Sequence, residues 1–380
     1  MQLKELINKY NIFFFIIILI FLYLTNNHFD YDHTLIFGGA DGASYLSISE
    51  DSPLITSKKI QPVHSERFFF PYVIGIISKI LNIEIFLVYK IFVLIILFFI
   101  NLYLFKILQL LKVNQKLLIV CLFLVNFNPY ITRFYIAVPT IINDLIFIFG
   151  ILLIIFYLIE QKNNKLLIFL GYILSFGSRQ SSIALIITFF LTKFKFRIIY
   201  KKKNIAYLGV FVFFIFIFLN YNYSKHTLFY DNQRSDQYSL EMRLFGFFLQ
   251  DSTIKEKLTF LILPFLSFAP LVFFFLVFRK FIKPIKNIVN SKILFSLFVF
   301  SVLIILQPIL SGTEVTGRNV IRLTTLTYIP ILILLLKTTK DRNINFFDSN
   351  ITYYIFCIFV IFYSFHPTFS KITLFNFLRF

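Results

Sequence analysis

The sequence predicts an all-α polytopic membrane protein that forms a single integral membrane domain over residues 1–380. Of its 380 residues, 58% are hydrophobic and only 14% are charged, whereas about a quarter of the residues of a soluble domain are charged. The mean hydropathy is +0.82. Apolar runs recur along the whole chain, and several approach the ~20 residues that an α-helix needs to cross a bilayer.

The first apolar run, 12–24, follows Lys4 and Lys9 and ends without the small residues of a signal-peptide cleavage site. It therefore resembles an uncleaved signal anchor whose N-terminus lies in the cytoplasm. Further runs with the composition of membrane spans follow at 85–105, 117–138, 141–159, 205–220, 258–278, 292–310, 321–336 and 351–365.

Two more apolar segments differ from ordinary spans. Segment 68–81 is short, contains Pro71 and Gly75, and is predicted to be an interfacial helix on the outer surface. Segment 166–192 is interrupted by the polar stretch 175–182, which predicts a short membrane hairpin that returns to its own side. Counting its two limbs, we expect about eleven membrane helices, with the N-terminus inside and the C-terminus outside.

The charge pattern follows the same topology. Lys and Arg number 37 and Asp and Glu 18, which gives a formal net charge of +19. The basic connections all fall on the cytoplasmic side, as the positive-inside rule requires. They are Lys106, Lys112 and Lys116, then Lys162 and Lys165, the run 193–203, the basic residues of 279–292, and Lys337, Lys340 and Arg342. This asymmetry predicts membrane lipids as partners and no nucleic acid.

The polar groups that could do chemistry lie in three outer loops, 26–84, 221–256 and 311–320. In the first loop, two glycines precede Asp41 and predict a short helix with Asp41 as its N-cap. Asp41 and Tyr45 would share one face of that helix. Asp41 is then either a plain cap or a carboxylate placed beside a membrane cavity.

Arg179 lies in the polar interruption of the predicted hairpin. A limb of about a dozen residues rises only ~18 Å, less than the ~30 Å hydrocarbon core. The interruption would therefore lie at membrane depth, where a charge persists only against protein or a water-filled cavity. Asp144, near the outer end of the span 141–159, would be a cap or structural partner, and a carboxylate at that depth predicts an ion pair with Arg133 or Arg179.

The order of these features resembles the polytopic GT-C glycosyltransferases, which take sugars from polyprenyl-phosphate donors at the outer face of the membrane. Asp41 and Tyr45 match the acidic residues and tyrosine of the first outer loop of that family. The family's His/Pro-rich stretch is matched loosely by Pro62, His64, Arg67 and Pro71. Gly42 stands where a second acid is common, so both a divalent metal and the identity of the base stay open.

The resemblance implies a role for each polar group. Asp41, with Asp32 as the second choice, would take or position the proton of the acceptor hydroxyl. The phosphate of the donor would be bound by the arginines of three segments, Arg67, Arg179 and Arg318. The substrate pocket would be lined by Tyr45, His64, Asp144 and Gln180. No zinc spacing, Walker loop or dinucleotide motif is present in the sequence.

The expected function is transfer of a sugar from a polyprenyl-phosphate donor to an envelope glycan, lipid or protein at the outer face of a bacterial inner membrane. One alternative is an O-antigen-type polysaccharide polymerase or ligase that acts on polyprenyl-diphosphate glycans. The other is a non-enzymatic flippase or transporter, for which broken helices in both halves of the chain are typical. The sequence predicts one interruption, at 166–192, and none in the C-terminal half. It specifies neither the sugar, the acceptor, the linkage nor the oligomeric state.

Overall fold

The computed structural model describes residues 9–25, 39–160, 164–196, 203–228, 240–278, 291–316, 319–338 and 350–364, and within these ranges it contains helices and no β-strand. Five described helices are long and apolar enough to cross a membrane, or up to seven if each of two bent helix pairs is one crossing. The predicted total of eleven is not confirmed, because the other apolar helices are 10–17 residues long, shorter than the ~20 residues of an untilted span.

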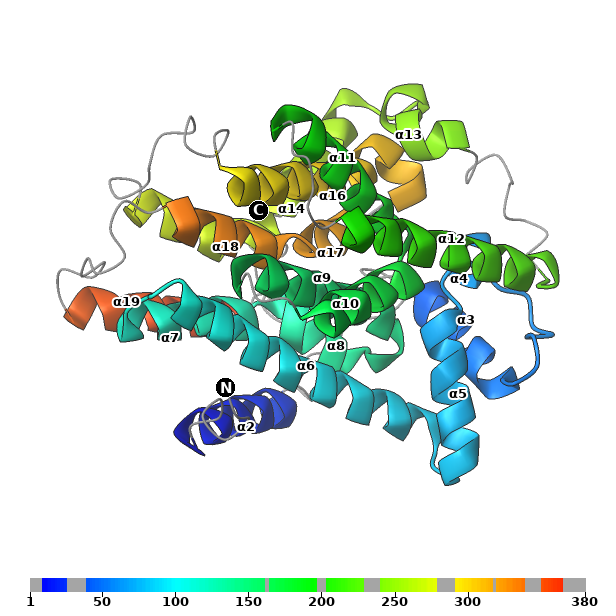
Figure 1. The fold of residues 1–380 in the computed structure, drawn as a ribbon, viewed down its shortest axis with the longest axis horizontal. Helices are drawn as coiled ribbons and strands as arrows, with labels where there is room; N and C mark the ends of the chain where they lie inside the picture. Colours follow the sequence, from blue (N-terminus) through cyan, green and yellow to red (C-terminus); the bar gives the residue numbers. More distant parts are fainter. Residues whose placement is uncertain are drawn as a thin grey trace, which may run out of the picture.

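Two spans of the N-terminal half have nearly the predicted bounds. They are α6 (Ile85–Leu110) and α9 (Ile142–Glu160). The first anchor, α2 (Lys9–Thr25), packs against α6 (Figure 1). Most side chains of α9 are buried, so this helix lies in the middle of the bundle.

The predicted span 117–138 corresponds to one candidate membrane span, Gln115–Ala137, whose helix is locally interrupted. It consists of α7 (Gln115–Asn126), a π-helical turn η2 (Pro129–Arg133) and a short helix α8 (Phe134–Ala137). The reason is Pro129, because a residue before proline avoids the helical region. Asn128 is extended there, and its side chain accepts a hydrogen bond from the backbone N–H of Tyr130. The chain then turns through η3 (Pro139–Ile141) into α9.

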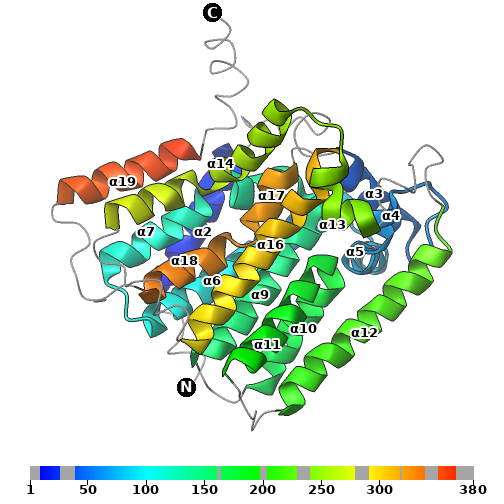
Figure 2. The same cartoon turned by 90° about the horizontal axis from the view of Figure 1, so that it is seen from above.

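Small residues hold α9 against α10 (Lys165–Ser178). A Cβ atom on Gly150 would lie 2.9 Å from the carbonyl oxygen of Gly171 and 2.5 Å from Oγ of Ser175. Such close backbone approach is typical of helix pairs inside membranes. Figure 2 shows the two helices side by side, and their pairing brings the first turn of α9 near the residue that follows α10.

The described part of the predicted first outer loop contains α3 (Gly39–Asp51), α4 (Pro62–Ser65) and α5 (Phe69–Leu81). These helices gather at one end of the bundle (Figure 2). A Cβ on Gly75 of α5 would lie 2.1 Å from the carbonyl oxygen of Ser49, so glycine is required where α5 crosses α3. The prediction that Asp41 is the N-cap is wrong, because α3 begins at Gly39 and Asp41 lies within its first turn.

The interruption predicted at 175–182 is present. Arg179 follows α10 in an extended conformation, with φ −151° and ψ 143°. The chain then continues through η4 (Gln180–Ser182) into α11 (Ile183–Phe196) and α12 (Lys203–Lys225). Whether this segment returns to its own side of a membrane stays a prediction.

The described C-terminal half consists of α13 (Leu240–Leu249), α14 (Ile254–Phe278), α16 (Lys292–Thr316), α17 (Asn319–Thr325), α18 (Tyr328–Thr338) and α19 (Asn350–Tyr363). The prediction that this half has no interruption is wrong. α14 contains Pro264 and Pro270 and its two parts meet at 66°, and α16 kinks at Gly312, whose φ is 77°.

A third break separates α17 from α18, which meet at 45°. Thr324 and Thr327 at this break donate their hydroxyls to backbone carbonyls three or four residues earlier. Such bonds compete with the helical ladder and bend helices. The break gives α17 its own direction within the bundle.

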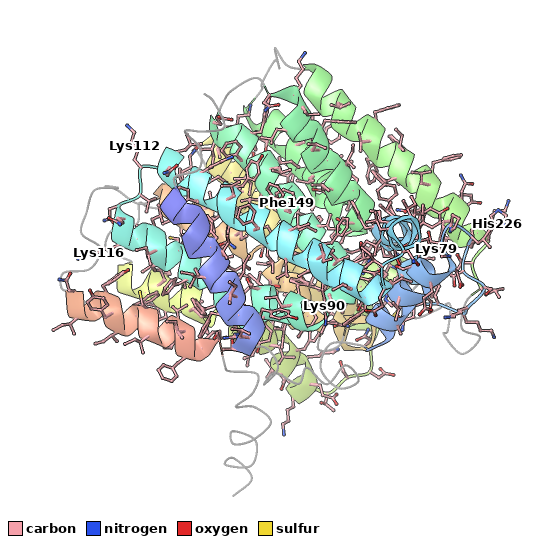
Figure 3. The ribbon with its side chains drawn as sticks, turned by 90° about the horizontal axis from the view of Figure 1, so that it is seen from below. Lys79, Lys90, Lys112, Lys116, Phe149 and His226 are labelled. Atoms are coloured by element: carbon pink, nitrogen blue, oxygen red, sulfur yellow. The ribbon has the colours of Figure 1, made fainter. Side chains whose placement is uncertain are left out.

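The outer surface of the bundle is apolar, and the basic side chains lie near its ends. On α12, Phe214 and Phe218 are 62% and 66% exposed, while Phe216 is buried. In Figure 3, Lys112 and Lys116 lie on one side of the molecule, and Lys79 and His226 on the other. A surface of this kind suits contact with lipid, which agrees with a multi-pass membrane protein.

Candidate functional site

Asp41 is at the centre of a buried polar cluster. Its Oδ1 is 2.9 Å from Nε2 of His64 on α4, and its Oδ2 accepts a 2.6 Å hydrogen bond from Nη2 of Arg322 on α17. Arg322 is 281 positions away from Asp41 in the chain. The first outer loop and the C-terminal half therefore meet at this carboxylate.

Two opposing effects act on Asp41. Burial raises the pKa of its carboxyl, but the positive charge of Arg322 and the hydrogen bonds from His64 and Arg322 lower it more, so the pKa lies well below its ordinary value. The ionised carboxylate can only accept hydrogen bonds. Nε2 of His64 is therefore the nitrogen that carries the hydrogen toward Asp41. Nδ1 of His64 is buried and has no hydrogen-bond partner among the described residues.

Asp144 joins two arginines to the cluster. Its Oδ1 pairs with Nη1 of Arg179, and its Oδ2 is 3.3 Å from Nε of Arg322. All three side chains are at most 3% exposed. Of the two partners expected for Asp144, the structure shows Arg179. The other, Arg133, donates a hydrogen bond to Oγ1 of Thr25 on α2.

Helix termini place these charges. Asp41 and Asp144 lie in the first turns of α3 and α9, where the helix dipole favours negative charge. Arg179 directly follows the last residue of α10, where the dipole favours positive charge. Buried charges are tolerated when they are paired and hydrogen-bonded. We call Asp41, His64, Asp144, Arg179 and Arg322 the inner cluster.

A second polar group, the outer cluster, consists of Glu66, Arg67, Gln180 and Arg243. Nε of Arg67 donates to Oε1 of Gln180 at 2.9 Å, and Nε2 of Gln180 donates to Oε2 of Glu66 at 2.6 Å. Nη1 of Arg243 on α13 is 3.5 Å from Oε2 of Glu66. The Glu66 and Arg243 side chains are about one-third exposed, at 31% and 33%, so this cluster forms the rim of the site.

The two clusters are joined by neighbours in the chain. Arg179 and Gln180 are consecutive, and Nδ2 of Asn143, next to Asp144, donates to the backbone carbonyl of Arg67 at 2.9 Å. The rim is thus adjacent to the buried pair Asp144–Arg179, because Gln180 directly follows Arg179 and Arg67 contacts the residue that precedes Asp144.

Gly42 lies in close contact with Thr140. A Cβ at this position would lie 2.7 Å from Oγ1 of Thr140, so a larger residue requires Thr140 to move. Within the described ranges, no group of three or more His, Cys, Asp or Glu side chains could hold a metal ion.

The structure brings together most of the predicted site residues, although their roles stay predictions. Asp41, His64, Asp144 and Arg179 are in the inner cluster and Arg67 and Gln180 in the outer one, and the ring of Tyr45 is 5.1 Å from that of His64. Asp32 and Arg318 lie outside the described residues.

Sequence reasoning missed Arg322, Glu66 and Arg243. Arg322 lies within the apolar run 321–336. A charged residue inside a predicted span indicates a functional site by default, and this signal would have found it. Glu66 and Arg243 are ordinary loop charges in the sequence, and only their contact reveals them.

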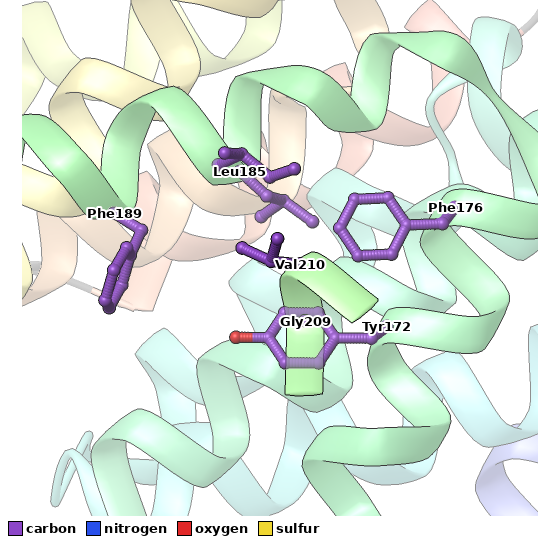
Figure 4. A pocket seen from close by; sticks show the side chains of 7 residues that line it. Tyr172, Phe176, Leu185, Phe189, Gly209 and Val210 are labelled. Atoms are coloured by element: carbon purple, nitrogen blue, oxygen red, sulfur yellow. The ribbon is translucent and has the colours of Figure 1, made fainter. Parts of the chain in front are cut away.

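An apolar groove lies near the polar site. It is lined by residues of α10, α11 and α12 (Figure 4): Tyr172, Phe176, Leu185, Ile186, Phe189, Gly209 and Val210. A Cβ on Gly209 would lie 2.9 Å from the ring of Tyr172, so this glycine lets the ring pack closely against α12. Phe176 precedes Arg179 by three residues, a rise of ~4.5 Å along a helix.

Comparisons of the chain with protein-family models, with curated proteins and with solved structures give no match. The case for a function therefore depends on the site itself.

Proposed function

We propose that the protein is a GT-C-like membrane glycosyltransferase that transfers a sugar from a polyprenyl-phosphate donor to an envelope glycan, lipid or protein. The observation that supports this function is the inner cluster, in which a buried carboxylate, Asp41, lies beside two buried arginines. Glycosyl transfer needs both kinds of group, a proton acceptor for the attacking hydroxyl and cations for the departing phosphate.

In the proposed reaction, the hydroxyl oxygen of the acceptor forms a bond to the anomeric carbon of the sugar. The bond from that carbon to the phosphate oxygen breaks, and its electron pair leaves with the polyprenyl phosphate. Asp41 accepts the hydroxyl proton. Arg179 and Arg322, with Arg67 at the rim, compensate the charge of the phosphate, for which planar guanidinium groups are well suited.

The charge of the site favours a monophosphate donor. In the described residues of the two clusters, four arginines face three carboxylates, which leaves one positive charge if His64 is neutral. A polyprenyl phosphosugar is a phosphodiester with one negative charge, and it would make the two clusters taken together neutral. The diphosphate-linked glycan of a polymerase or ligase would leave an excess negative charge, which is costly in a site of low dielectric.

The membrane setting completes the proposal. The groove between α10, α11 and α12 would hold the first part of the lipid chain. We propose a bacterial inner membrane, with about eleven membrane helices, the N-terminus in the cytoplasm, and the site facing outward.

A flippase or transporter is the second candidate, and the breaks of the C-terminal half favour it. Discontinuous helices in both halves of a chain are typical of transporters. Here the breaks near Asn128 and Arg179 have counterparts in α14, at Gly312 and between α17 and α18. The sequence argument against a transporter therefore no longer holds.

One experiment separates the two candidates. The purified protein in lipid nanodiscs is given a panel of radiolabelled polyprenyl-phosphate sugars and envelope acceptors, and transfer is measured. We expect Asp41→Asn to lower the rate about 10²–10⁴-fold, the usual contribution of a general base, while the protein still accumulates in the membrane.

Asp51→Asn is the matched control. Asp51 lies at the other end of α3 and accepts hydrogen bonds from Thr56 and Ser57, so transfer should be unchanged. Full transfer by Asp41→Asn would remove Asp41 from the reaction. Lipid translocation in vesicles without transfer would support the transporter.

A further inference from the structure

Both carboxylate oxygens of Asp41 contact protein side chains in this structure, although the proposed function needs Asp41 as a proton acceptor. One oxygen faces Nε2 of His64 at 2.9 Å and the other Nη2 of Arg322 at 2.6 Å. A carboxylate that is paired with a guanidinium is a weak base. The conformation described here is therefore closed with respect to proton transfer, and something must withdraw one of these two partners.

Arg322 is the partner that another anion can withdraw. Its Nη2 binds Asp41, its Nε lies near Asp144, and its Nη1 is buried with no acceptor among the described residues. Arg179 has the same property, because its Nη1 pairs with Asp144 while its buried Nε has no acceptor in the part of the chain that the structure describes.

Two buried guanidinium groups that share Asp144 thus each retain an unused N–H. A buried donor without an acceptor costs about 1–3 kcal/mol. An anion with several oxygens in tetrahedral array can accept hydrogen bonds from both guanidinium groups at once. Phosphate is the anion of this kind that the proposed reaction contains.

We propose that the phosphate of the donor binds between Arg322 and Arg179 and draws Arg322 away from Asp41, so that Asp41 can accept a proton only when the donor is bound. This inference rests on the proposed function. His64 stays on Oδ1 of Asp41 and holds the carboxylate in place, while Oδ2 becomes available to the acceptor.

The reaction step balances with this arrangement. The acceptor hydroxyl gives its proton to Oδ2 of Asp41 as its oxygen bonds to the anomeric carbon, and the phosphate leaves with the electron pair of the broken carbon–oxygen bond. The proton then passes from Asp41 to the polyprenyl phosphate or to solvent. When the phosphate departs, Arg322 returns to Asp41 and the site closes again.

The switch predicts opposite effects for the two residues of this ion pair. In Asp41→Asn the carboxylate no longer competes with phosphate for Arg322, so phosphate binding should become tighter even though transfer is lost. In Arg322→Gln binding should become weaker. The two variants of one ion pair should therefore move the same affinity in opposite directions.

The test measures binding of a short-chain polyprenyl monophosphate to the full-length protein in nanodiscs of zwitterionic lipid. We expect Asp41→Asn to bind at least tenfold more tightly than the wild type and Arg322→Gln at least tenfold more weakly. Asp51→Asn and Arg133→Gln are the matched controls and should leave the affinity unchanged. If Arg322→Gln does not fold, Arg322→Lys, which keeps the charge but loses the forked geometry, should weaken binding as well.

Two other probes identify the ligand. Inorganic phosphate and nanodiscs with phosphatidylglycerol should compete weakly, and an equal response of these probes to the variants would overturn the assignment to the donor. Unchanged or weaker binding by Asp41→Asn would overturn the switch itself. Opposite shifts in the two variants without any sugar transfer would leave the switch in place and reject the glycosyltransferase.

Discussion

The pair formed by Asp144 and Arg179 allows a quantitative test of how the inner cluster is held together. Each side chain is only 2% exposed. Removal of one partner from a buried ion pair leaves an uncompensated charge and costs about 3–5 kcal/mol. The perturbations are Asp144→Asn, Arg179→Gln and the double variant. Asp144→Asn preserves the shape of the side chain, and Arg179→Gln replaces the guanidinium with a shorter neutral amide.

The structure predicts that the two single variants are unequal. After Arg179→Gln, Asp144 keeps Arg322, whose Nε is 3.3 Å from its Oδ2, so the loss should lie near the lower limit, about 3 kcal/mol. After Asp144→Asn, both arginines lose the carboxylate that they share, and the loss should approach the upper limit, about 5 kcal/mol. The double variant should lose at least ~1 kcal/mol less than the sum, because contacting residues are coupled.

The assay is reversible unfolding in mixed micelles by titration with sodium dodecyl sulfate, followed by circular dichroism. The free energies of unfolding of the four proteins form a double-mutant cycle. Additive losses, or losses below about 1 kcal/mol for both single variants, are the values of a solvent-exposed pair and would refute the reasoning. A loss for Arg179→Gln that exceeds the loss for Asp144→Asn would refute the role of Arg322.

Three further predictions follow from other parts of the structure. Gly75→Ala should destabilise the protein by about 1–3 kcal/mol, because its Cβ would clash with the backbone carbonyl of Ser49, and the same unfolding assay measures this loss; an unchanged stability would contradict the packing of α5 on α3. The carboxylate of Asp41 has a folded-state pKa below its unfolded value of 3.8, so its contribution to stability is present above that pH and is lost as the pH falls through the folded pKa. The stability difference between wild type and Asp41→Asn should therefore be constant above about pH 5 and shrink in stronger acid. A stability difference that changes near neutral pH would contradict this prediction. Single cysteines at Lys112 and His226 should react with an impermeant thiol reagent from opposite faces of the membrane, and labelling of both from one face would overturn the topology.

The sequence predicted best what depends on length and apolarity. The run 141–159 became α9, Ile142–Glu160, because a long apolar segment has few alternatives to a buried helix. The helix breaks of the C-terminal half were not predicted from the sequence. Prolines and glycines are tolerated inside membrane helices, so their presence does not say where a helix bends. The kink at Gly312 depends on contacts with α13, since a Cβ there would meet the backbone nitrogen of Phe247 at 2.7 Å.

The candidate site was likewise predicted only in part from the sequence. Arg179 was found because a polar interruption between two short apolar limbs must face protein or water, whatever the rest of the fold. The partner of Asp41 was not found, because the approach of α17 to α3 is a property of tertiary packing. Arg322 nevertheless carried a local signal as a charge within an apolar run. That signal should have outweighed Arg318, which the sequence predicts to lie in a loop, where an arginine needs no explanation.

The separation into an inner and an outer cluster has a consequence for how a charged donor could reach buried groups. The described inner cluster compensates its own charges, since two carboxylates face two arginines, so it is stable without a ligand. The excess positive charge belongs to the rim, where two arginines, Arg67 and Arg243, are accompanied by the single carboxylate of Glu66. In the proposed reaction, attraction of a phosphate would therefore begin where solvent is present and desolvation is cheap, and the buried arginines would act only after the phosphate has entered. A site with the opposite order, an unpaired charge in the core and a neutral rim, would cost several kcal/mol in the empty protein and would attract the donor less.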